Sequence, residues 1–291
     1  MKLALRFGIL LGFWGVAASA EVRVTDDLGR TIRLDQPAQR IVALAPSATE
    51  LLFAVGAGDR VVAVVDYSDF PAAAASIRRV GSSHSLDLEA IVAANPDLVL
   101  AWASGNPPRQ VERLREIGIK VFTLEVRALE DIPTAVERIG KLTGTEGKAN
   151  LVARNLRDRA ERLQSRAGPA VPARVFYQLL DDNLMTVNGA HIISDILRRC
   201  GGSNVFADMP LLVARVDMEA VFVARPEVIL GGGEQALWRR WLTRWQQRPD
   251  LPAVKNGRLF FIEGDLIHRP GPRIVDAAER VCAQLDAATP H

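Results

Sequence analysis

The chain has 291 residues, of which 24% are charged, and its formal net charge is +2. It contains no dense tract of Lys or Arg, which excludes the basic surface typical of a nucleic-acid-binding protein. Its length and its hydrophobic content of 48% are sufficient for two domains, each with its own core.

The N-terminus has the features of a secretory signal peptide. Lys2 and Arg6 form a basic head, residues 7–16 are an uncharged apolar run, and residues 18–20 (Ala-Ser-Ala) resemble a cleavage site. We predict export to the periplasm with cleavage after Ala20; a buried first helix is the alternative. The run is too short to span a membrane, and no Cys lies near the cleavage point for lipid attachment. Cleavage removes Lys2 and Arg6 from the 36 basic residues and leaves 34, which equals the number of acidic residues, so the mature chain is formally neutral.

Short apolar runs alternate with helical segments from residue 40 to residue 124. The runs are rich in strand formers, whereas Gly56, Pro96 and Gly118 stand where helices would end. The expected strands are 40–45, 61–65, 98–102 and 120–124, and the expected helices are 48–55, 88–94 and 108–117. This order predicts βαβ units with mainly parallel strands.

A charged segment without Pro follows at residues 145–166. Leu151, Leu156 and Leu163 lie near helical spacing in it, which predicts a helix of about 20 residues, roughly 30 Å long, that ends before Gly168. A second βα series then begins, with strands expected at 174–177, 228–230 and 259–262. The predicted fold is therefore α/β: an N-terminal lobe (21–144), a linking helix (145–167) and a C-terminal lobe (168–291), with mainly parallel sheets and a ligand cleft between the lobes.

An internal repeat supports this division into two lobes. Residues 86–100 align without a gap on residues 216–230, at an offset of 130, and the acids, one Ala, one Pro and the apolar positions keep register. Two lobes built on the same unit would create this repeat, whereas a single continuous sheet would not require it.

The repeat gives each half of the chain a pair of acids. Asp87 and Asp217 are placed as helix N-caps, and Glu89 and Glu219 then fall in the first helical turn. There a carboxylate gains roughly 0.3–1 kcal/mol from the helix dipole, and this structural role is sufficient by itself. The functional alternative is that both glutamates are exposed and dock onto Arg residues of a two-fold symmetric partner.

The two cysteines, Cys200 and Cys282, allow two interpretations. In an oxidising compartment an isolated pair most simply forms one disulfide. Two buried free thiols are the alternative.

The chain lacks the spacing of known catalytic motifs. No Gly-x-Ser-x-Gly or His-Glu-x-x-His occurs, and we expect a protein that is not an enzyme. Residues 231–233 (Gly-Gly-Gly) lack the spacing of a nucleotide-binding loop, and we interpret them as a tight turn that opens onto the cleft. Trp238, Trp241 and Trp245 recur at helical spacing, which favours core packing over a ligand-binding or partner-binding stripe.

Several segments resemble a known family. Those similar to the helical-backbone periplasmic binding proteins of ABC importers are 46–51 (PSATEL), 67–71 (YSDFP), 95–99 (NPDLV) and 269–274 (RPGPRI). Residues 101–106 (AWASGN) and 200–206 (CGGSNVF) are most similar to the cobalamin-binding members of that family. The similarity covers nearly the whole mature chain.

The resemblance implies two α/β lobes joined by one long helix, with a corrinoid held between them. It implies that Cys200 and Cys282 are joined within the second lobe. It also implies that Glu89 and Glu219 meet Arg residues of a permease dimer at the inner membrane. A monomer with no resident cofactor is expected.

The same resemblance places Tyr67, Trp102, Asp265 and Arg269 at the cleft. Aromatic faces can pack on a macrocycle, while Asp265 and Arg269 can meet its amide-bearing rim.

Two cleft positions depart from the cobalamin-binding pattern, because Ser83 and Val213 stand where Trp is expected. The departures remove two large flat contacts and leave another corrinoid or another macrocycle open. His84 and His268 are each interpreted either as an ordinary polar residue or as a contact with the ligand or its metal. Heme is the alternative ligand, with Tyr67 or His84 as the axial ligand of its iron. An iron-siderophore is a further alternative. The four histidines are not at metal-ligand spacing, so we predict no site for free zinc or manganese.

Overall fold

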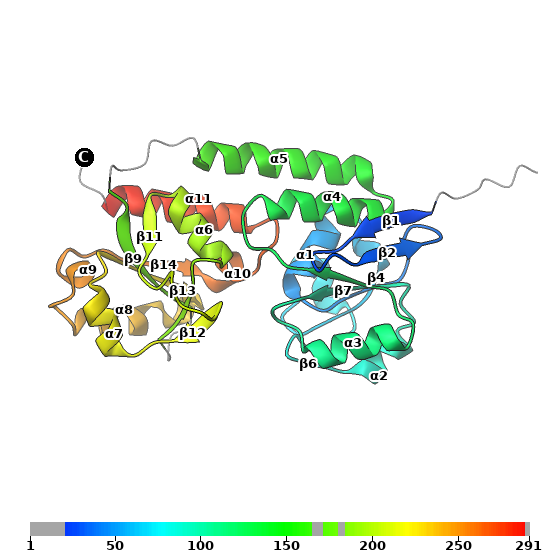
Figure 1. The fold of residues 1–291 in the computed structure, drawn as a ribbon, viewed down its shortest axis with the longest axis horizontal. Coiled ribbons are helices and arrows are strands. Elements are labelled where there is room, and N and C mark those ends of the chain that lie inside the picture. The colour runs from blue at the N-terminus through cyan, green and yellow to red at the C-terminus, as the bar shows by residue number, and fades with distance from the viewer. Residues whose placement is uncertain (1–20, 165–170, 180–183, 289–291) are drawn as a thin grey trace, which may run out of the picture.

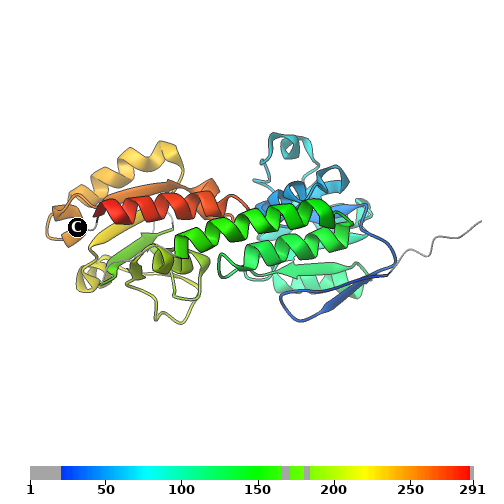
Figure 2. The ribbon, with the colours of Figure 1, turned by 90° about the horizontal axis from the view of Figure 1, so that it is seen from above.

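The computed structural model describes residues 21–164, 171–179 and 184–288, so the predicted signal peptide lies outside the described residues. The described residues form two α/β lobes side by side, and helix α5 (Glu146–Gln164) lies across both (Figures 1 and 2). Each lobe contains a four-stranded parallel sheet, which confirms the predicted fold class. In this part of the chain no helix is both long enough and apolar enough to cross a membrane.

The sheet of the N-terminal lobe has the strand order β4-β3-β7-β8. Its strands are β3 (Ile41–Ala43), β4 (Val61–Val64), β7 (Leu98–Trp102) and β8 (Val121–Leu124), and its helices are α1 (Pro46–Ala54), α2 (Leu88–Ala93), α3 (Pro108–Glu116) and α4 (Asp131–Thr143). Two antiparallel pairs flank it, β1 (Val22–Thr25) with β2 (Thr31–Leu34) and β5 (Gly81–Ser82) with β6 (Ser85–Leu86). Ile41 faces one core and Val42 the other, so both faces of the sheet are buried and the strands are continuous apolar runs.

The sheet of the C-terminal lobe has the order β11-β9-β13-β14. Its strands are β9 (Ala173–Gln178), β11 (Gly202–Asn204), β13 (Val228–Gly233) and β14 (Leu259–Glu263), with an antiparallel pair of β10 (Met185–Val187) and β12 (Val213–Arg215) beside them. Its helices are α6 (Ile192–Arg199), α7 (Met218–Ala224), α8 (Trp238–Gln246), α9 (Pro252–Lys255), α10 (Gly264–Ile267) and α11 (Ile274–Ala288).

The glycines at 231–233 form the end of strand β13, so their interpretation as a tight turn is wrong. A Cβ on Gly231 would lie 2.7 Å from the Trp241 ring, and one on Gly232 would lie 2.0 Å from Tyr177 Oη. Glycine is therefore needed here because large side chains pack directly on the strand. The predicted core packing of the tryptophans is confirmed, since Trp241 and Trp245 are buried and both donate from Nε1 to Gln178 Oε1, at 2.9 and 3.0 Å.

Helix α5 joins the lobes through a shared apolar core. One face of the helix is buried in it, through Ala149, Ala153, Leu156, Ala160 and Leu163. The same core includes residues of strands β3 and β9, so it runs without a break from one lobe into the other. The positions 165–167 at the end of the predicted linking helix lie outside the described residues.

Two arginines of α5 extend this connection at the surface. Arg157 donates to both carboxylate oxygens of Glu137 on α4, at 2.6 and 2.7 Å. Arg159 binds Asp276 and Glu279 on α11, at 2.5 and 2.8 Å. The helix is thus bound to α4 in one lobe and to α11 in the other, as Figure 2 shows from above.

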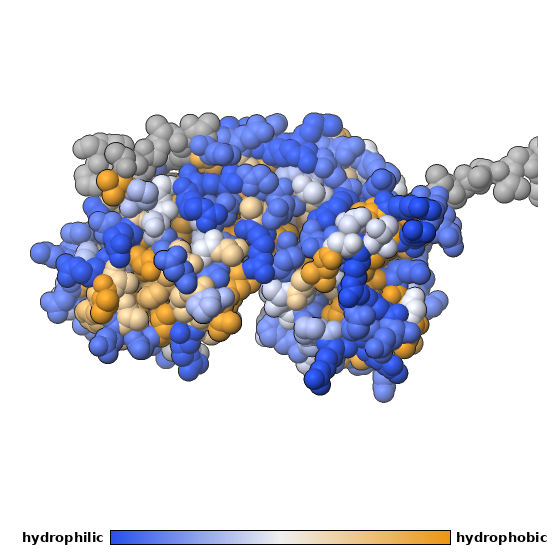
Figure 3. Space-filling model, viewed as in Figure 1, coloured by the Kyte–Doolittle hydropathy of each residue, from blue (hydrophilic) through white to orange (hydrophobic). Residues whose placement is uncertain are grey.

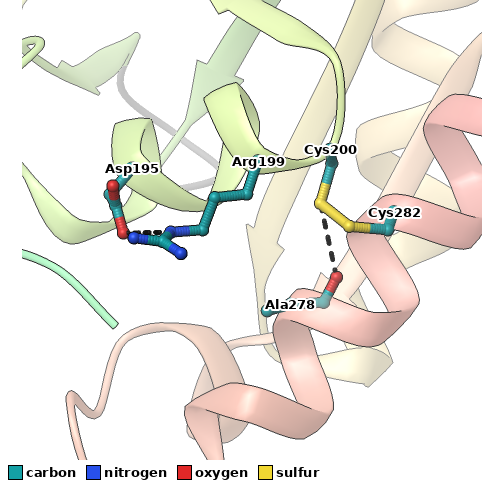
Figure 4. Close-up of a disulfide and its surroundings, with 5 residues drawn as sticks. All are labelled: Asp195, Arg199, Cys200, Ala278 and Cys282. Atoms are coloured by element: carbon teal, nitrogen blue, oxygen red, sulfur yellow. Dashed lines mark hydrogen bonds and ion pairs between the residues drawn. A yellow bond between two sulfur atoms is a disulfide. The ribbon is translucent and has the colours of Figure 1, made fainter. Parts of the chain in front are cut away.

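Cys200 and Cys282 form a disulfide, so the alternative of two free thiols is wrong. Cys200 follows the end of α6, and Cys282 is buried on α11 (Figure 4). The bond closes a separation of 82 residues within the C-terminal lobe. In the chain-entropy model such a loop stabilises the folded state by about 4–5 kcal/mol.

Candidate functional site

The lobes are separated by a notch that opens on the side opposite α5 (Figure 3). Trp102, the last residue of β7, lines one pocket together with Ala45 and Ser47, which follow β3, and with Pro270 of the other lobe. The carboxyl ends of parallel strands are where open α/β sheets bind ligands. The candidate site is therefore this inter-lobe cleft.

The loop after β4 reaches the C-terminal lobe through Asp69, which binds Arg269. Tyr67 lies in this loop, is exposed and has a φ of 62°, a backbone conformation that bulky residues rarely adopt. The N–H of Asp66 donates to the Gly81 carbonyl at 2.8 Å, so the loop lies beside the β5–β6 hairpin. Ser83 and His84 form the tip of that hairpin, and His84 is exposed. The structure thus brings three of the predicted residues to one end of the N-terminal sheet.

Trp102 is held in place by a buried amide that the sequence interpretation did not single out. The Asn106 side chain accepts from the Trp102 N–H at 2.7 Å and donates to the carbonyls of Leu44 and Ser83 at 2.8 and 2.9 Å. A Cβ on Gly105 would lie 1.9 Å from the Trp102 ring. The segment AWASGN therefore fixes the aromatic ring and ties β3, β7 and the hairpin together.

Arg269 bridges the two lobes. Its Nη1 lies 2.6 Å from Asp69 Oδ1 and 3.6 Å from Glu50 Oε1, both in the N-terminal lobe. Its Nη2 lies 2.7 Å from Asp265 Oδ1 on α10. Although burial would raise the pKa of Asp69, the hydrogen bond from Arg269 lowers it below its usual value. Two predicted residues, Asp265 and Arg269, are thus in contact, and Arg269 has a further partner, Asp69, that sequence reasoning did not single out.

A second inter-lobe ion pair lies beside the first. Arg273 Nε and Nη2 donate to Glu50 Oε2 and Oε1 at 2.9 and 2.5 Å, and the guanidinium also stacks over the Phe70 ring at 3.8 Å. The hydrogen bond to Glu50 raises the pKa of Arg273. The sequence signals for this pair are the PSATEL and RPGPRI segments, which contain Glu50 and Arg273 but do not show that the two meet.

The other predicted ligand residues lie in the C-terminal lobe. Val213 begins β12, pairs with Val187 and is partly buried against the main core. His268 lies 2.8 Å through Nε2 from the buried hydroxyl of Tyr177, and burial lowers its pKa to about 4. His268 is therefore neutral at pH 7 and is paired with Tyr177. Within the described residues no group of three or more His, Cys, Asp or Glu is arranged to hold a metal ion.

The repeated acids lie at the N-terminal ends of α2 and α7. Asp87 and Asp217 cap α2 and α7 by accepting from the N–H of the residue three positions on, at 2.9 and 2.7 Å, which confirms the predicted caps. Glu89 and Glu219 are exposed in the first turns of these helices. Both helices lie on the side of the molecule opposite α5, one in each lobe (Figure 1).

Two lobes around an inter-lobe cleft define a solute-binding protein. The model of the periplasmic binding protein family matches residues 41–266, and the chain belongs to this family, whose members bind solutes rather than catalyse reactions. A vitamin B12-binding protein of Vibrio cholerae serotype O1 is 35% identical over 257 residues, which cover 87% of this chain and 91% of that protein. A vitamin B12-binding protein of Photorhabdus laumondii is 35% identical over 247 residues, covering 85% and 88%.

Solved structures show the same fold. The crystal structure of the vitamin B12-binding protein BtuF of Vibrio cholerae superimposes with a TM-score of 0.81 at 34% identity, covering 87% of this chain and 98% of that one. The heme-binding protein RhuT of Roseiflexus has a TM-score of 0.73 at 23% identity and covers 87% and 100%, a likeness of fold alone. The resemblance stated from the sequence is confirmed.

Proposed function

We propose that this protein captures cobalamin or a related corrinoid in the periplasm and delivers it to an ABC importer. The observations that support the ligand best are that Trp102 and Pro270, from opposite lobes, line one pocket and that Asp69 and Arg269 pair across the lobes. Tyr67 and Trp102 come from the N-terminal lobe, and Asp265 and Arg269 come from the C-terminal lobe. Aromatic faces and a small number of polar groups suit a large, flat ligand with a polar rim. The similarity to vitamin B12-binding proteins at 35% identity supports the same assignment.

Ser83 and Val213 give this cleft less aromatic surface than two tryptophans would. Ser83 lies at the hairpin tip near Tyr67, and Val213 lies on the opposite lobe. We infer that the ligand gains its flat contacts from Tyr67 and Trp102 and has more room beside the hairpin. A corrinoid with a bulky axial substituent would fit that room.

Heme is the second candidate because Tyr67 and His84 are exposed on neighbouring segments, the loop after β4 and the β5–β6 hairpin. A phenolate or an imidazole can ligate heme iron. Titration of the mature protein with cyanocobalamin and with hemin, followed by the visible spectrum of each ligand, distinguishes the two. We expect saturable 1:1 binding of cyanocobalamin. Binding of hemin alone at micromolar concentration would overturn the assignment, and binding of neither would favour an iron-siderophore.

We further propose that Glu89 and Glu219 dock onto Arg residues of the permease dimer. Each lobe has one exposed carboxylate in this repeat, and the helices that carry them, α2 and α7, lie on the same side of the molecule (Figure 1). This arrangement matches a two-fold symmetric partner, and bidentate Arg pairing would fix the orientation. Charge reversal at both positions should abolish binding to the permease in nanodiscs and leave ligand affinity unchanged. The matched control reverses Glu146 and Glu161 on α5, which lies on the opposite side. Equal binding by both double variants would refute the docking assignment.

A further inference from the structure

Arg269 does not offer an accessible positive charge to the cleft. Its side chain is only 10% exposed, whereas those of Asp69 and Asp265 are 51% and 64% exposed. Both carboxylates contact the guanidinium through Oδ1. A ligand that enters the cleft therefore meets two carboxylates, one from each lobe, with a buried cation behind them.

The charges of this cluster do not cancel. Glu50, Asp69 and Asp265 carry three negative charges against the two positive charges of Arg269 and Arg273. Arg273 is already paired with Glu50, so the excess negative charge lies on the two exposed carboxylates. An ionised carboxylate only accepts hydrogen bonds, and the surroundings favour a ligand edge that carries N–H donors over one that carries further carboxylates.

We propose that Asp69 is a specificity-determining residue that, together with Asp265, forms an acceptor site for amide N–H groups on the rim of the ligand. The inference rests on the proposed corrinoid function, because corrinoids carry primary amides around their ring whereas heme carries two propionates. Asp69 is two residues from Tyr67, so a single loop supplies both an aromatic face and an acceptor. Arg269 binds both carboxylates and links the two lobes at this point.

The direct test replaces Asp69 by Asn, which keeps the size of the side chain and removes its charge. Because hydrogen bonds to charged groups are the stronger ones, the Kd for cyanocobalamin should rise at least about 10-fold in D69N. The affinity for hemin should stay the same or increase. D66N is the matched control, since Asp66 is an exposed acid in the same loop that lies outside the cluster, and its Kd should equal that of the unaltered protein.

A second measurement needs no variant. The derivatives to use are cyanocobalamins in which one rim amide is hydrolysed to a carboxylate. The derivative altered at the amide that faces this site should bind the unaltered protein at least about 10-fold more weakly than cyanocobalamin. In D69N that difference should shrink. D265N should reproduce the effect from the other lobe, which keeps the test valid where D69N folds poorly.

The outcomes separate the two proposals. An unaltered protein that binds no cyanocobalamin overturns the corrinoid function and the acceptor site together. If the unaltered protein binds cyanocobalamin and D69N binds it equally well, the function stands and the acceptor site is refuted. An equal loss of cyanocobalamin and hemin affinity in D69N also refutes it, because Asp69 would then only hold the lobes together.

Discussion

Replacement of Glu50 by Gln should weaken the connection between the lobes. Glu50 is only 2% exposed and belongs to α1 of the N-terminal lobe, yet its carboxylate receives two hydrogen bonds from Arg273, 223 residues later in the chain. Arg269 approaches the same carboxylate at 3.6 Å. Loss of this charge leaves two guanidinium groups facing an uncharged amide in a largely desolvated place.

Removal of one partner of a buried ion pair costs about 3–5 kcal/mol. Arg273 is 20% exposed and keeps its stacking contact with Phe70, so the lower end of that range applies here. We expect E50Q to lower the free energy of unfolding by about 3 kcal/mol. R273M should cost a similar amount, because it leaves the buried Glu50 carboxylate facing the more distant Arg269, whose Nη1 lies 3.6 Å from Glu50 Oε1.

Urea unfolding of E50Q, R273M and the double variant gives the coupling energy between the two residues. The double variant should be more stable than the sum of the single losses predicts, by about 2 kcal/mol. E116Q is the control, because it breaks the exposed Arg113–Glu116 pair on α3 and should cost less than about 0.5 kcal/mol. Strictly additive losses, or a loss in E50Q no larger than that in E116Q, would refute the inter-lobe role of this pair.

Three further predictions follow from the same structure. Replacement of Cys200 and Cys282 by Ala should lower the free energy of unfolding by about 4 kcal/mol under oxidising conditions, and the difference should vanish in reductant. Folding lowers the pKa of His268 from 6.5 to about 4, so below pH 6.5 the unfolded state binds a proton that the folded state does not. The free energy of unfolding should therefore be unaffected by this group above pH 6.5 and fall by up to about 3 kcal/mol as the pH falls to 4. H268Q should flatten this part of the pH profile measured by urea unfolding. N106A should weaken ligand binding and lower the melting temperature, because it leaves the carbonyls of Leu44 and Ser83, the first of them buried, without this donor; an unchanged melting temperature would contradict that bonding pattern.

Much of the fold can be predicted because both sheets are buried on both faces. Such strands are short unbroken apolar runs, as at 98–102, and they stand out against the charged helices between them. The helix caps at Asp87 and Asp217 are equally local, since the carboxylate and the N–H it binds are three residues apart. Patterns contained within a few consecutive residues can be interpreted without knowledge of the tertiary structure.

Two elements are not predicted correctly from the sequence, one because it contains a proline and one because it depends on distant residues. Helix α4 contains Pro133, which discourages a helix prediction, but the residue lies in the first turn, where its missing N–H has no helical partner. The glycines at 231–233 suggested a turn because glycine favours turns. Their role follows instead from Trp241 and Tyr177, which pack against the strand from distant positions.

The site shows the same limit. Asp265 and Arg269 could be placed at the cleft by resemblance, but Asp69 could not be found, because its contact with Arg269 spans 200 residues. The contact between Glu50 and Arg273 spans 223 residues. Pairings of this kind depend on the relative position of the two lobes, which a local sequence pattern does not predict.

The capped acidic helices α2 and α7 are near copies of each other, one in each lobe. On a two-fold symmetric membrane partner, a rotation of the protein by 180° would bring Glu219 to the place of Glu89. The symmetry of such a partner makes two arrival orientations productive instead of one, which doubles the encounter rate and contributes about 0.4 kcal/mol of statistical free energy. Because α2 and α7 are near copies, each half of the membrane complex would meet the same kind of capped acidic turn, and consecutive cargo deliveries would proceed equally well in either orientation.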